Sequence, residues 1–212
     1  MNINPLELFK KLLENYGPQH WWPGKGFEIA IGAILTQNTS WKNVELAIKN
    51  LKSNNLTTPK KILESDLNFL KNLIKPVGFF NQKALYLKNL SKFWLENPKP
   101  KREDLLEVRG IGEETADSIL LYLFNEPQFI IDAYTIRISQ RIGFNSSSKK
   151  DFWKEFYKRS LPEDTQLYNE FHALFVAHGK KLCKKILPLC EVCFIKEDCL
   201  FNQKKRDGFY SL

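Results

Sequence analysis

The segment that decides the fold is LLEVRGIGEETA, residues Leu105–Ala116. A helical stretch ends near Val108, two glycines follow at Gly110 and Gly112, and a second helix begins at Glu113. Because glycine lets the backbone turn tightly and approach a ligand closely, the segment predicts a helix-hairpin-helix. Amides at the start of the second helix would bind a DNA phosphate without reading sequence. A plain connection between two helices is the competing interpretation.

Apolar residues recur at helical spacing along nearly the whole chain, and no strand-like alternation is sustained. Turn-forming residues such as Pro23-Gly24 and Pro76-Val77-Gly78 separate the periodic segments. We therefore expect an all-α fold. Beyond a first helix around Leu6–Leu13, we expect helices over 27–35, 44–51, 59–64, 67–74, 81–95, 101–108, 113–124, 134–142, 150–161 and 165–182.

The composition is that of a globular protein, with 212 residues of which 43% are hydrophobic. No apolar stretch approaches the roughly 20 residues of a membrane span, and the N-terminus lacks the features of a signal peptide, so a cytoplasmic location is expected. A net charge of +8 favours a polyanionic partner, although a solvated basic surface would give the same number. Between His178 and Arg206 there are eight basic residues against three acidic ones.

All four cysteines lie in one short segment with the spacing C-x6-C-x2-C-x5-C. Thiolates gathered in this way favour an iron-sulfur cluster or zinc. Two disulfides are disfavoured in a reducing cytosol, and zinc sites of four cysteines usually contain two C-x2-C pairs, of which only one is present. A structural, phosphate-facing role is expected here, with neighbouring lysines contacting DNA. The residues concerned are Cys183, Cys190, Cys193 and Cys199 with Lys184 and Lys185.

Asp132 follows the apolar pair Ile130-Ile131 and opens a helix. Aspartate is a favoured N-cap that stabilises a helix by about 1 kcal/mol, so capping alone would explain the residue. Its position after the hairpin and before the cysteines allows a second interpretation.

In this order and spacing, the hairpin, Asp132 and the cysteines resemble the endonuclease III family of the helix-hairpin-helix DNA glycosylase superfamily. The resemblance covers nearly the whole chain and includes Gly32–Thr39, Gly78–Ala84 and His178-Gly179. It implies a six-helix barrel with the hairpin over residues 22–132. Residues 1–21 and 133–212 would form a smaller helical domain that binds a 4Fe-4S cluster through the four cysteines.

The same resemblance makes Asp132 the catalytic carboxylate and places Gln37 where a side chain fills the gap left by an extruded base. Gln37 could equally be an exposed polar residue at a helix end. Arg109 and Lys83 are candidate DNA contacts together with the hairpin glycines, with ordinary surface charges as the alternative. His172 and His178 are expected to serve packing or hydrogen bonding rather than proton transfer.

Glu114 marks a departure from the family pattern. Bifunctional members carry a lysine immediately before the Thr-Ala of the hairpin, and its amine attacks the sugar to form a Schiff base. A carboxylate cannot form an imine. We therefore expect a monofunctional glycosylase, in which Asp132 stabilises positive charge on the sugar and positions or deprotonates a water.

Three tryptophans, Trp21, Trp22 and Trp41, are candidates for binding the base, with packing in the core as the alternative. Aromatic faces stabilise the positive charge of an alkylated purine by about 0.5–2 kcal/mol. With the hairpin that lacks lysine, they resemble the 3-methyladenine DNA glycosylase branch of the family. One member of that branch lacks the cysteine cluster, whereas this sequence keeps all four ligands.

The expected partner is duplex DNA containing a damaged base, bound by a monomer. A bifunctional enzyme acting on oxidised pyrimidines is the first alternative, and Glu114 is the feature against it. The second is an iron-sulfur DNA-binding module that has lost catalysis, against which Asp132 argues.

Overall fold

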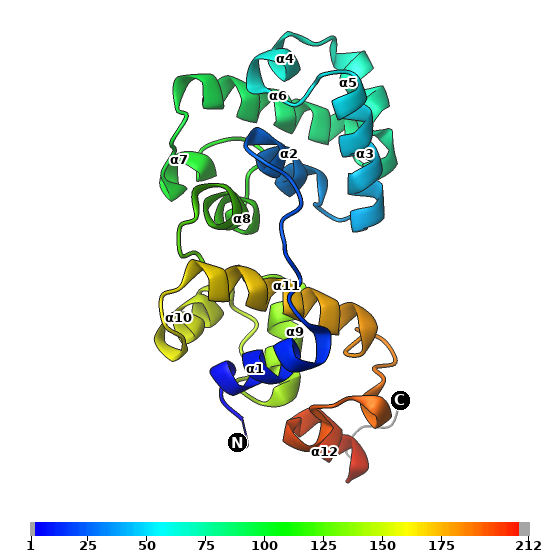
Figure 1. Cartoon of the computed structure of the whole chain (residues 1–212), viewed down its shortest axis with the longest axis vertical. Helices are drawn as coiled ribbons and strands as arrows, with labels where there is room; N and C mark the ends of the chain where they lie inside the picture. Colours follow the sequence, from blue (N-terminus) through cyan, green and yellow to red (C-terminus); the bar gives the residue numbers. More distant parts are fainter. Residues whose placement is uncertain (1–2, 208–212) are drawn as a thin grey trace. The chain divides into compact units, whose positions relative to one another are not determined.

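The computed structural model describes residues 3–207, and every regular element in this range is helical, which confirms the all-α prediction. The chain forms two compact units. The central unit is Trp22–Glu126, and the terminal unit combines the segments that precede and follow it (Figure 1). Among the described helices, none combines the length and hydropathy that a membrane span requires.

The central unit is built around helix α2 (Phe27–Leu35), whose residues from Ile29 to Leu35 are all buried. This burial explains why the stretch from Ile29 to Leu35 is apolar on every side. Gly32 is required there, because a Cβ atom would come within 2.4 Å of the Trp22 ring. The other elements of the unit are α3 (Trp41–Ser53), α4 (Pro59–Glu64), α5 (Leu67–Ile74), the 3-10 turn η1 (Lys75–Val77), α6 (Phe80–Glu96), α7 (Arg102–Leu106) and α8 (Glu113–Phe124).

The terminal unit has an aromatic core. Phe129 stacks on Tyr157 with ring centroids 4.3 Å apart, and Phe171 stacks on Phe175 at 4.5 Å. Helix α1 packs against α11, so both ends of the chain contribute to one core. The elements are α1 (Pro5–Tyr16), α9 (Ala133–Ile142), α10 (Lys150–Ser160), α11 (Thr165–Lys181), the 3-10 turns η2 (Cys190–Val192) and η3 (Lys196–Asp198), and α12 (Leu200–Arg206).

The break between the units falls after Glu126, whereas the resemblance implied a boundary at Asp132. The reason is Phe129, which is buried against Tyr157 and Phe171. The segment before Asp132 therefore packs as part of the terminal unit. Helix α12 and the 3-10 turns near the cysteines are additions to the expected set of helices.

Candidate functional site

The predicted hairpin is present as α7, a turn and α8. Gly110 has φ +102°, and a Cβ atom there would come within 2.2 Å of the Tyr86 ring, so only glycine fits. Gly112 is extended at φ −97° and caps α8, and a Cβ atom at this position would meet nothing within 4 Å. Close packing therefore explains the first glycine alone. Arg109 is exposed beside the turn, and its carbonyl accepts a hydrogen bond from Asn89 at 3.3 Å.

Gln37 is fixed to this hairpin. Its Nε2 donates to the carbonyl of Gly110 at 3.1 Å and to the hydroxyl of Thr115 at 3.0 Å. The side chain also lines a surface hollow of roughly 450 Å³, including space open to solvent. The other residues that line it are Asn38, Phe79, Gln82, Lys83 and Tyr86.

Lys83 requires a correction, because its placement contradicts an exposed DNA contact. The residue is only 2% exposed, and its Nζ donates to the carbonyls of Leu35 at 2.9 Å and Val77 at 3.0 Å. Burial lowers the pKa of Lys83 to about 8. The side chain is thus an internal link between the end of α2 and η1.

Phe79 is a residue that the sequence analysis missed. Its side chain is 65% exposed and lines the same hollow as Gln37. Its backbone is left-handed at φ 45°, a conformation that costs a non-glycine residue about 1–3 kcal/mol. An exposed aromatic side chain on a strained backbone indicates a functional surface. Gly78 before it marks the turn, but nothing in the sequence shows which way the ring points.

Asp132 caps helix α9, as its sequence position suggests. Its Oδ1 accepts hydrogen bonds from the backbone amide of Thr135 at 2.7 Å and from the Thr135 hydroxyl at 2.9 Å. Its Oδ2 lies 3.6 Å from Nε2 of His172 on α11, and both side chains are largely buried. The capping and functional interpretations are therefore compatible, because Oδ1 makes the cap and Oδ2 is not used by it.

The electrostatics of Asp132 favour the ionised form. Burial alone would raise the pKa of the carboxyl, but His172 and the two donors of Thr135 outweigh it, and the pKa lies below its usual value of 3.8. A carboxylate held ionised with little water around it can strongly stabilise a nearby positive charge. His172 was expected to serve packing or hydrogen bonding, and no sequence pattern connects it to Asp132.

Two of the three candidate tryptophans meet. The rings of Trp22 and Trp41 are 5.0 Å apart and nearly perpendicular, and Tyr122 lies 5.4 Å from Trp22. Trp41 also packs against the core of the central unit, which agrees with the alternative of core packing, and base binding by Trp22 and Trp41 stays a prediction. Trp21 belongs to the terminal unit, and its part in base binding stays a prediction.

Glu114 is exposed in the first turn of α8, one residue before Thr115. Its carbonyl accepts a hydrogen bond from the Ser118 hydroxyl at 2.6 Å. An acidic side chain interacts favourably with the positive N-terminal end of a helix dipole, so Glu114 also stabilises α8.

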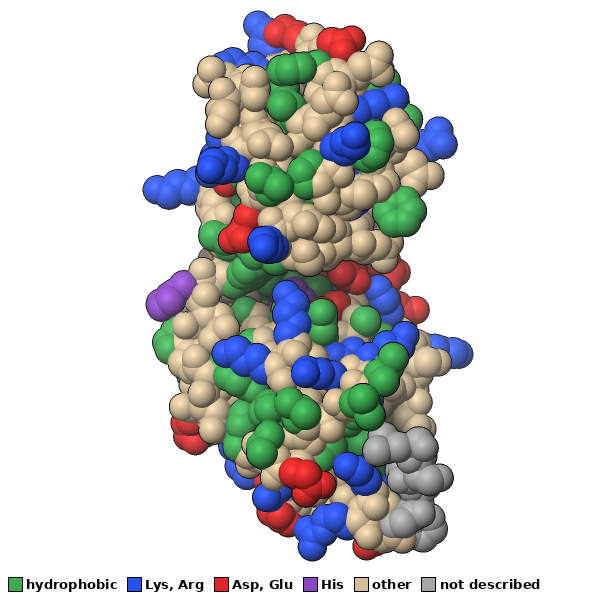
Figure 2. All heavy atoms as spheres, turned by 90° about the vertical axis from the view of Figure 1, so that its right-hand side faces the viewer, with side chains coloured by type: hydrophobic (Ala, Val, Ile, Leu, Met, Phe, Trp, Pro, Cys, Tyr) green, Lys and Arg blue, Asp and Glu red, His purple; other side chains and the backbone are tan. Residues whose placement is uncertain are grey.

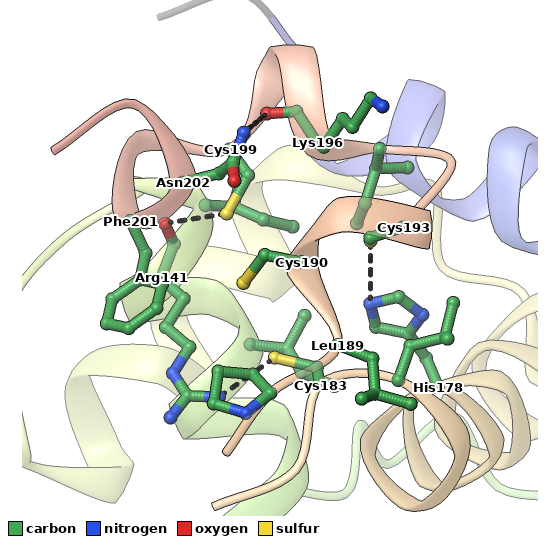
Figure 3. A pocket seen from close by; sticks show the side chains of 15 residues that line it. Arg141, His178, Cys183, Leu189, Cys190, Cys193, Lys196, Cys199, Phe201 and Asn202 are labelled. Atoms are coloured by element: carbon green, nitrogen blue, oxygen red, sulfur yellow. Dashed lines mark hydrogen bonds between the residues drawn. The ribbon is translucent and has the colours of Figure 1, made fainter. Parts of the chain in front are cut away.

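The four cysteines line one hollow of roughly 380 Å³, including space open to solvent (Figure 3). All four are free thiols, so the disulfide alternative finds no support. Among the described residues, no three Cys, His, Asp or Glu side chains converge on one ion position. Zinc would need its sulfur ligands at about 2.3 Å from one point, whereas a 4Fe-4S cluster binds each cysteine through a different iron. The separated sulfurs around a shared hollow fit the cluster better.

Arg141 on α9 holds the beginning of this segment. Its guanidinium donates to the sulfur of Cys183 at 3.3 Å and to the carbonyls of Lys184 at 2.6 Å and Lys185 at 3.0 Å. The side chains of both lysines remain exposed. Figure 2 shows Lys and Arg side chains beside hydrophobic ones on the face of the terminal unit.

A helix-hairpin-helix, a carboxylate at the start of a later helix and a C-terminal cysteine segment together define a helix-hairpin-helix DNA glycosylase. Residues 31–163 match the model of the HhH-GPD superfamily of base excision DNA repair proteins, and the chain belongs to this family.

Relatives agree with this assignment. A Methanocaldococcus jannaschii protein, named as a DNA repair glycosylase by inference, is 48% identical over 209 residues, covering 92% of this chain and 94% of that one. The endonuclease III of Thermotoga maritima is 30% identical over 206 residues, covering 95% of each chain. The structure of H. pylori 3-methyladenine DNA glycosylase bound to 1,N6-ethenoadenine has a TM-score of 0.77 at 29% identity, covering 84% of this chain and 98% of that one. The protein is thus a DNA N-glycosylase of base excision repair.

Proposed function

We propose that this protein is a monofunctional glycosylase that hydrolyses the N-glycosidic bond of an alkylated purine flipped from duplex DNA. The observation that carries the proposal is the environment of Asp132. The carboxylate is buried, kept ionised and fixed in orientation, because Thr135 binds one oxygen and His172 faces the other.

Asp132 has two tasks in the proposed reaction. As the bond between C1′ of the sugar and the base nitrogen breaks, its electron pair leaves with the base and positive charge develops on the sugar. The Asp132 carboxylate stabilises this charge and orients a water, whose oxygen adds to C1′ while its proton passes to the carboxylate. A purine alkylated at N3 or N7 already carries positive charge, so it departs without a general acid.

Glu114 supports the monofunctional part of the proposal. It occupies the position before Thr115 at which the Schiff-base lysine of bifunctional enzymes is expected, and a carboxylate has no nucleophilic amine. The 30% identity to an endonuclease III supports the bifunctional alternative.

Duplex DNA would be held by the hairpin and by the cysteine segment. Amides of Gly110 and Gly112 and the start of α8 suit a phosphate, with Arg109 exposed beside them. Lys184 and Lys185 supply charge on the terminal unit. The protein would bind as a monomer.

Gln37 and Phe79 are proposed to occupy the space vacated by the flipped base. They line the same hollow, and an exposed aromatic ring can insert between base pairs and unstack them. Gln37 donates to the Gly110 carbonyl, so the residue proposed to support the opened duplex is hydrogen-bonded to the hairpin proposed to bind phosphate.

The base itself would contact the tryptophans. The rings of Trp22 and Trp41, with Tyr122 beside them and Trp21 as a further candidate, offer faces that attract a cationic base by about 0.5–2 kcal/mol. The similar H. pylori glycosylase was crystallised with 1,N6-ethenoadenine, a modified purine, which supports this substrate class.

We also propose that Cys183, Cys190, Cys193 and Cys199 hold a 4Fe-4S cluster. When bound, the cluster would stabilise the loop that carries Lys184 and Lys185. It would take no part in hydrolysis of the base. Iron and acid-labile sulfide analysis of protein purified without oxygen tests this part, and zinc in their place would contradict it.

The experiment for the main proposal is release of free bases from methylated duplex DNA, separated by chromatography, alongside a test for strand nicking. Release of 3-methyladenine without nicking is the expected result. Release of oxidised pyrimidines with nicking from a second duplex that contains them, or an imine trapped there by borohydride, would establish the bifunctional alternative. Tight binding to damaged duplexes without release of any base would indicate the non-catalytic module.

A further inference from the structure

We infer that Tyr16 and His178 form a directed hydrogen-bond chain to the sulfur of Cys193, which sets the reduction potential of the metal cluster. The inference rests on the cofactor part of the proposed function and adds to the four cysteines two positioning residues from different helices.

Two contacts of His178 beside the cysteine hollow form this hydrogen-bond chain. Nδ1 of His178 lies 3.0 Å from the hydroxyl of Tyr16. Nε2 of the same ring lies 4.0 Å from the sulfur of Cys193, and Figure 3 shows this second contact. The two ring nitrogens of one histidine thus face two different partners. Tyr16 is the last residue of α1, whereas His178 belongs to α11.

The surroundings hold both rings in place. His178 is 1% exposed. Phe194 contacts both rings, with centroids 5.4 Å from that of Tyr16 and 5.6 Å from that of His178. The ammonium of Lys181 lies 4.8 Å from the centre of the Tyr16 ring. The histidine therefore keeps its orientation through packing, and its hydrogen bonds lie away from bulk water.

The direction of the chain follows from the chemistry of the sulfur. A cysteine that binds iron is a thiolate, which can accept a hydrogen bond but has no proton to donate. Nε2 of His178 must therefore carry the proton that points at Cys193. In a neutral ring Nδ1 is then an acceptor, and the Tyr16 hydroxyl must donate to it.

An N–H···S hydrogen bond withdraws electron density from the sulfur and stabilises the more reduced form of a cluster. Tyr16 acts one step away, since its hydroxyl determines which nitrogen of His178 carries the proton. Without it, the proton can move to Nδ1 and the bond to Cys193 is lost. Loss of either residue should therefore make the cluster easier to oxidise.

The test compares Tyr16→Phe and His178→Phe, which keep an aromatic ring at each place, with the wild-type protein, all purified without oxygen. Iron and sulfide are measured first, and then the midpoint potential by voltammetry. We expect both variants to retain the cluster and to shift the potential to more negative values. The double variant should shift it no further than His178→Phe, because Tyr16 acts only through His178.

Tyr168→Phe is the matched control. It removes a hydroxyl from another buried tyrosine of the terminal unit, one that packs on Phe129, and should leave the potential unchanged. Unchanged potentials in Tyr16→Phe and His178→Phe would overturn the inference. If His178→Phe loses the cluster, Tyr16→Phe alone decides. A wild-type protein without iron and sulfide would overturn the cofactor proposal and this inference with it, whereas base release would test the glycosylase proposal separately.

Discussion

Oδ2 of Asp132 lies 3.6 Å from Nε2 of His172, while Oδ1 of the same carboxylate accepts both hydrogen bonds from Thr135. The helix cap thus uses one oxygen and leaves the other facing the imidazole ring of His172. A residue that looks like an ordinary cap in the sequence thus has one oxygen available for the chemistry that we propose. His172, on a different helix, completes its surroundings.

Asp132→Asn should separate the two roles of this residue. Asparagine caps helices as well as aspartate, so the variant should keep the cap of α9, and its thermal unfolding temperature should fall only by the part that the charge of the carboxylate contributes. Base release should fall by about 10²–10⁴-fold, because the neutral amide neither stabilises the charged sugar nor accepts a proton from water. The control is Asp66→Asn at the start of α5, where Asp66 accepts from Phe69 at 2.8 Å and should act only as a cap. Equal activity of wild type and Asp132→Asn would reduce Asp132 to a cap.

His172→Phe should change how activity depends on pH. Burial still acts on Asp132 in this variant, but the favourable contact with His172 is gone, so the pKa of the carboxyl should rise. The acid limb of kcat/KM for base release should therefore move to higher pH. His20→Phe, at an exposed position, serves as the control. An acid limb that does not move would show that His172 has no influence on the carboxylate.

The same shift has a consequence for stability. Because the folded state holds the pKa of Asp132 below its usual value of 3.8, the carboxylate stabilises the fold above that pH. This contribution is lost as pH falls through the lowered folded pKa. Urea unfolding should show that Asp132→Asn, which cannot titrate, lacks this part of the acid destabilisation.

Glu114→Lys should introduce the missing nucleophile. The new amine would stand before Thr115 at the start of α8, where the helix dipole favours the uncharged form that attacks the sugar. Borohydride trapping on duplexes with an abasic site should give a covalent complex that the wild type does not form. Glu113→Lys adds the same charge one residue earlier and is the control. Equal trapping by both variants would point to adventitious reaction with any nearby lysine.

Lys83→Met should lower the free energy of unfolding, because the carbonyls of Leu35 and Val77 lose their donor, at about 1–3 kcal/mol for each unsatisfied group. The wild type should also gain stability as pH rises from about 8 towards 10.5, since the unfolded chain binds a proton at this lysine that the folded chain has released. The variant should lack that gain. Lys92→Met, exposed on the same helix α6, is the control, and identical pH profiles for Lys83→Met and wild type would contradict the internal link.

Much of the fold could be predicted from local signals. The bounds of α4, α5 and α8 agree with the expected ranges, because proline, aspartate and glycine stand where those helices begin. The short helix α12 and the 3-10 turns beside the cysteines were missed, since elements of a few residues carry no readable periodicity.

The site could be predicted only in part. The hairpin, Asp132 and the cysteines lie in short sequence patterns, so they could be located from the sequence. The pairing of His172 with Asp132 depends on how α9 and α11 pack, and no spacing encodes it. Lys83 was misjudged because lysine is almost always exposed, and only the tertiary structure shows its two carbonyl partners.

The contact between Tyr16 and His178 joins residues separated by 162 positions in the chain. During synthesis on the ribosome, α1 emerges first but lacks the helix against which it packs, whereas the central unit is complete long before α11 has been made. The proposed metal centre could acquire its full surroundings only after α11 and the cysteine segment have been released. Truncated products of translation would therefore carry a folded hairpin unit without the proposed metal centre, and iron loading would be a late step of biogenesis that distinguishes full-length molecules from truncated ones.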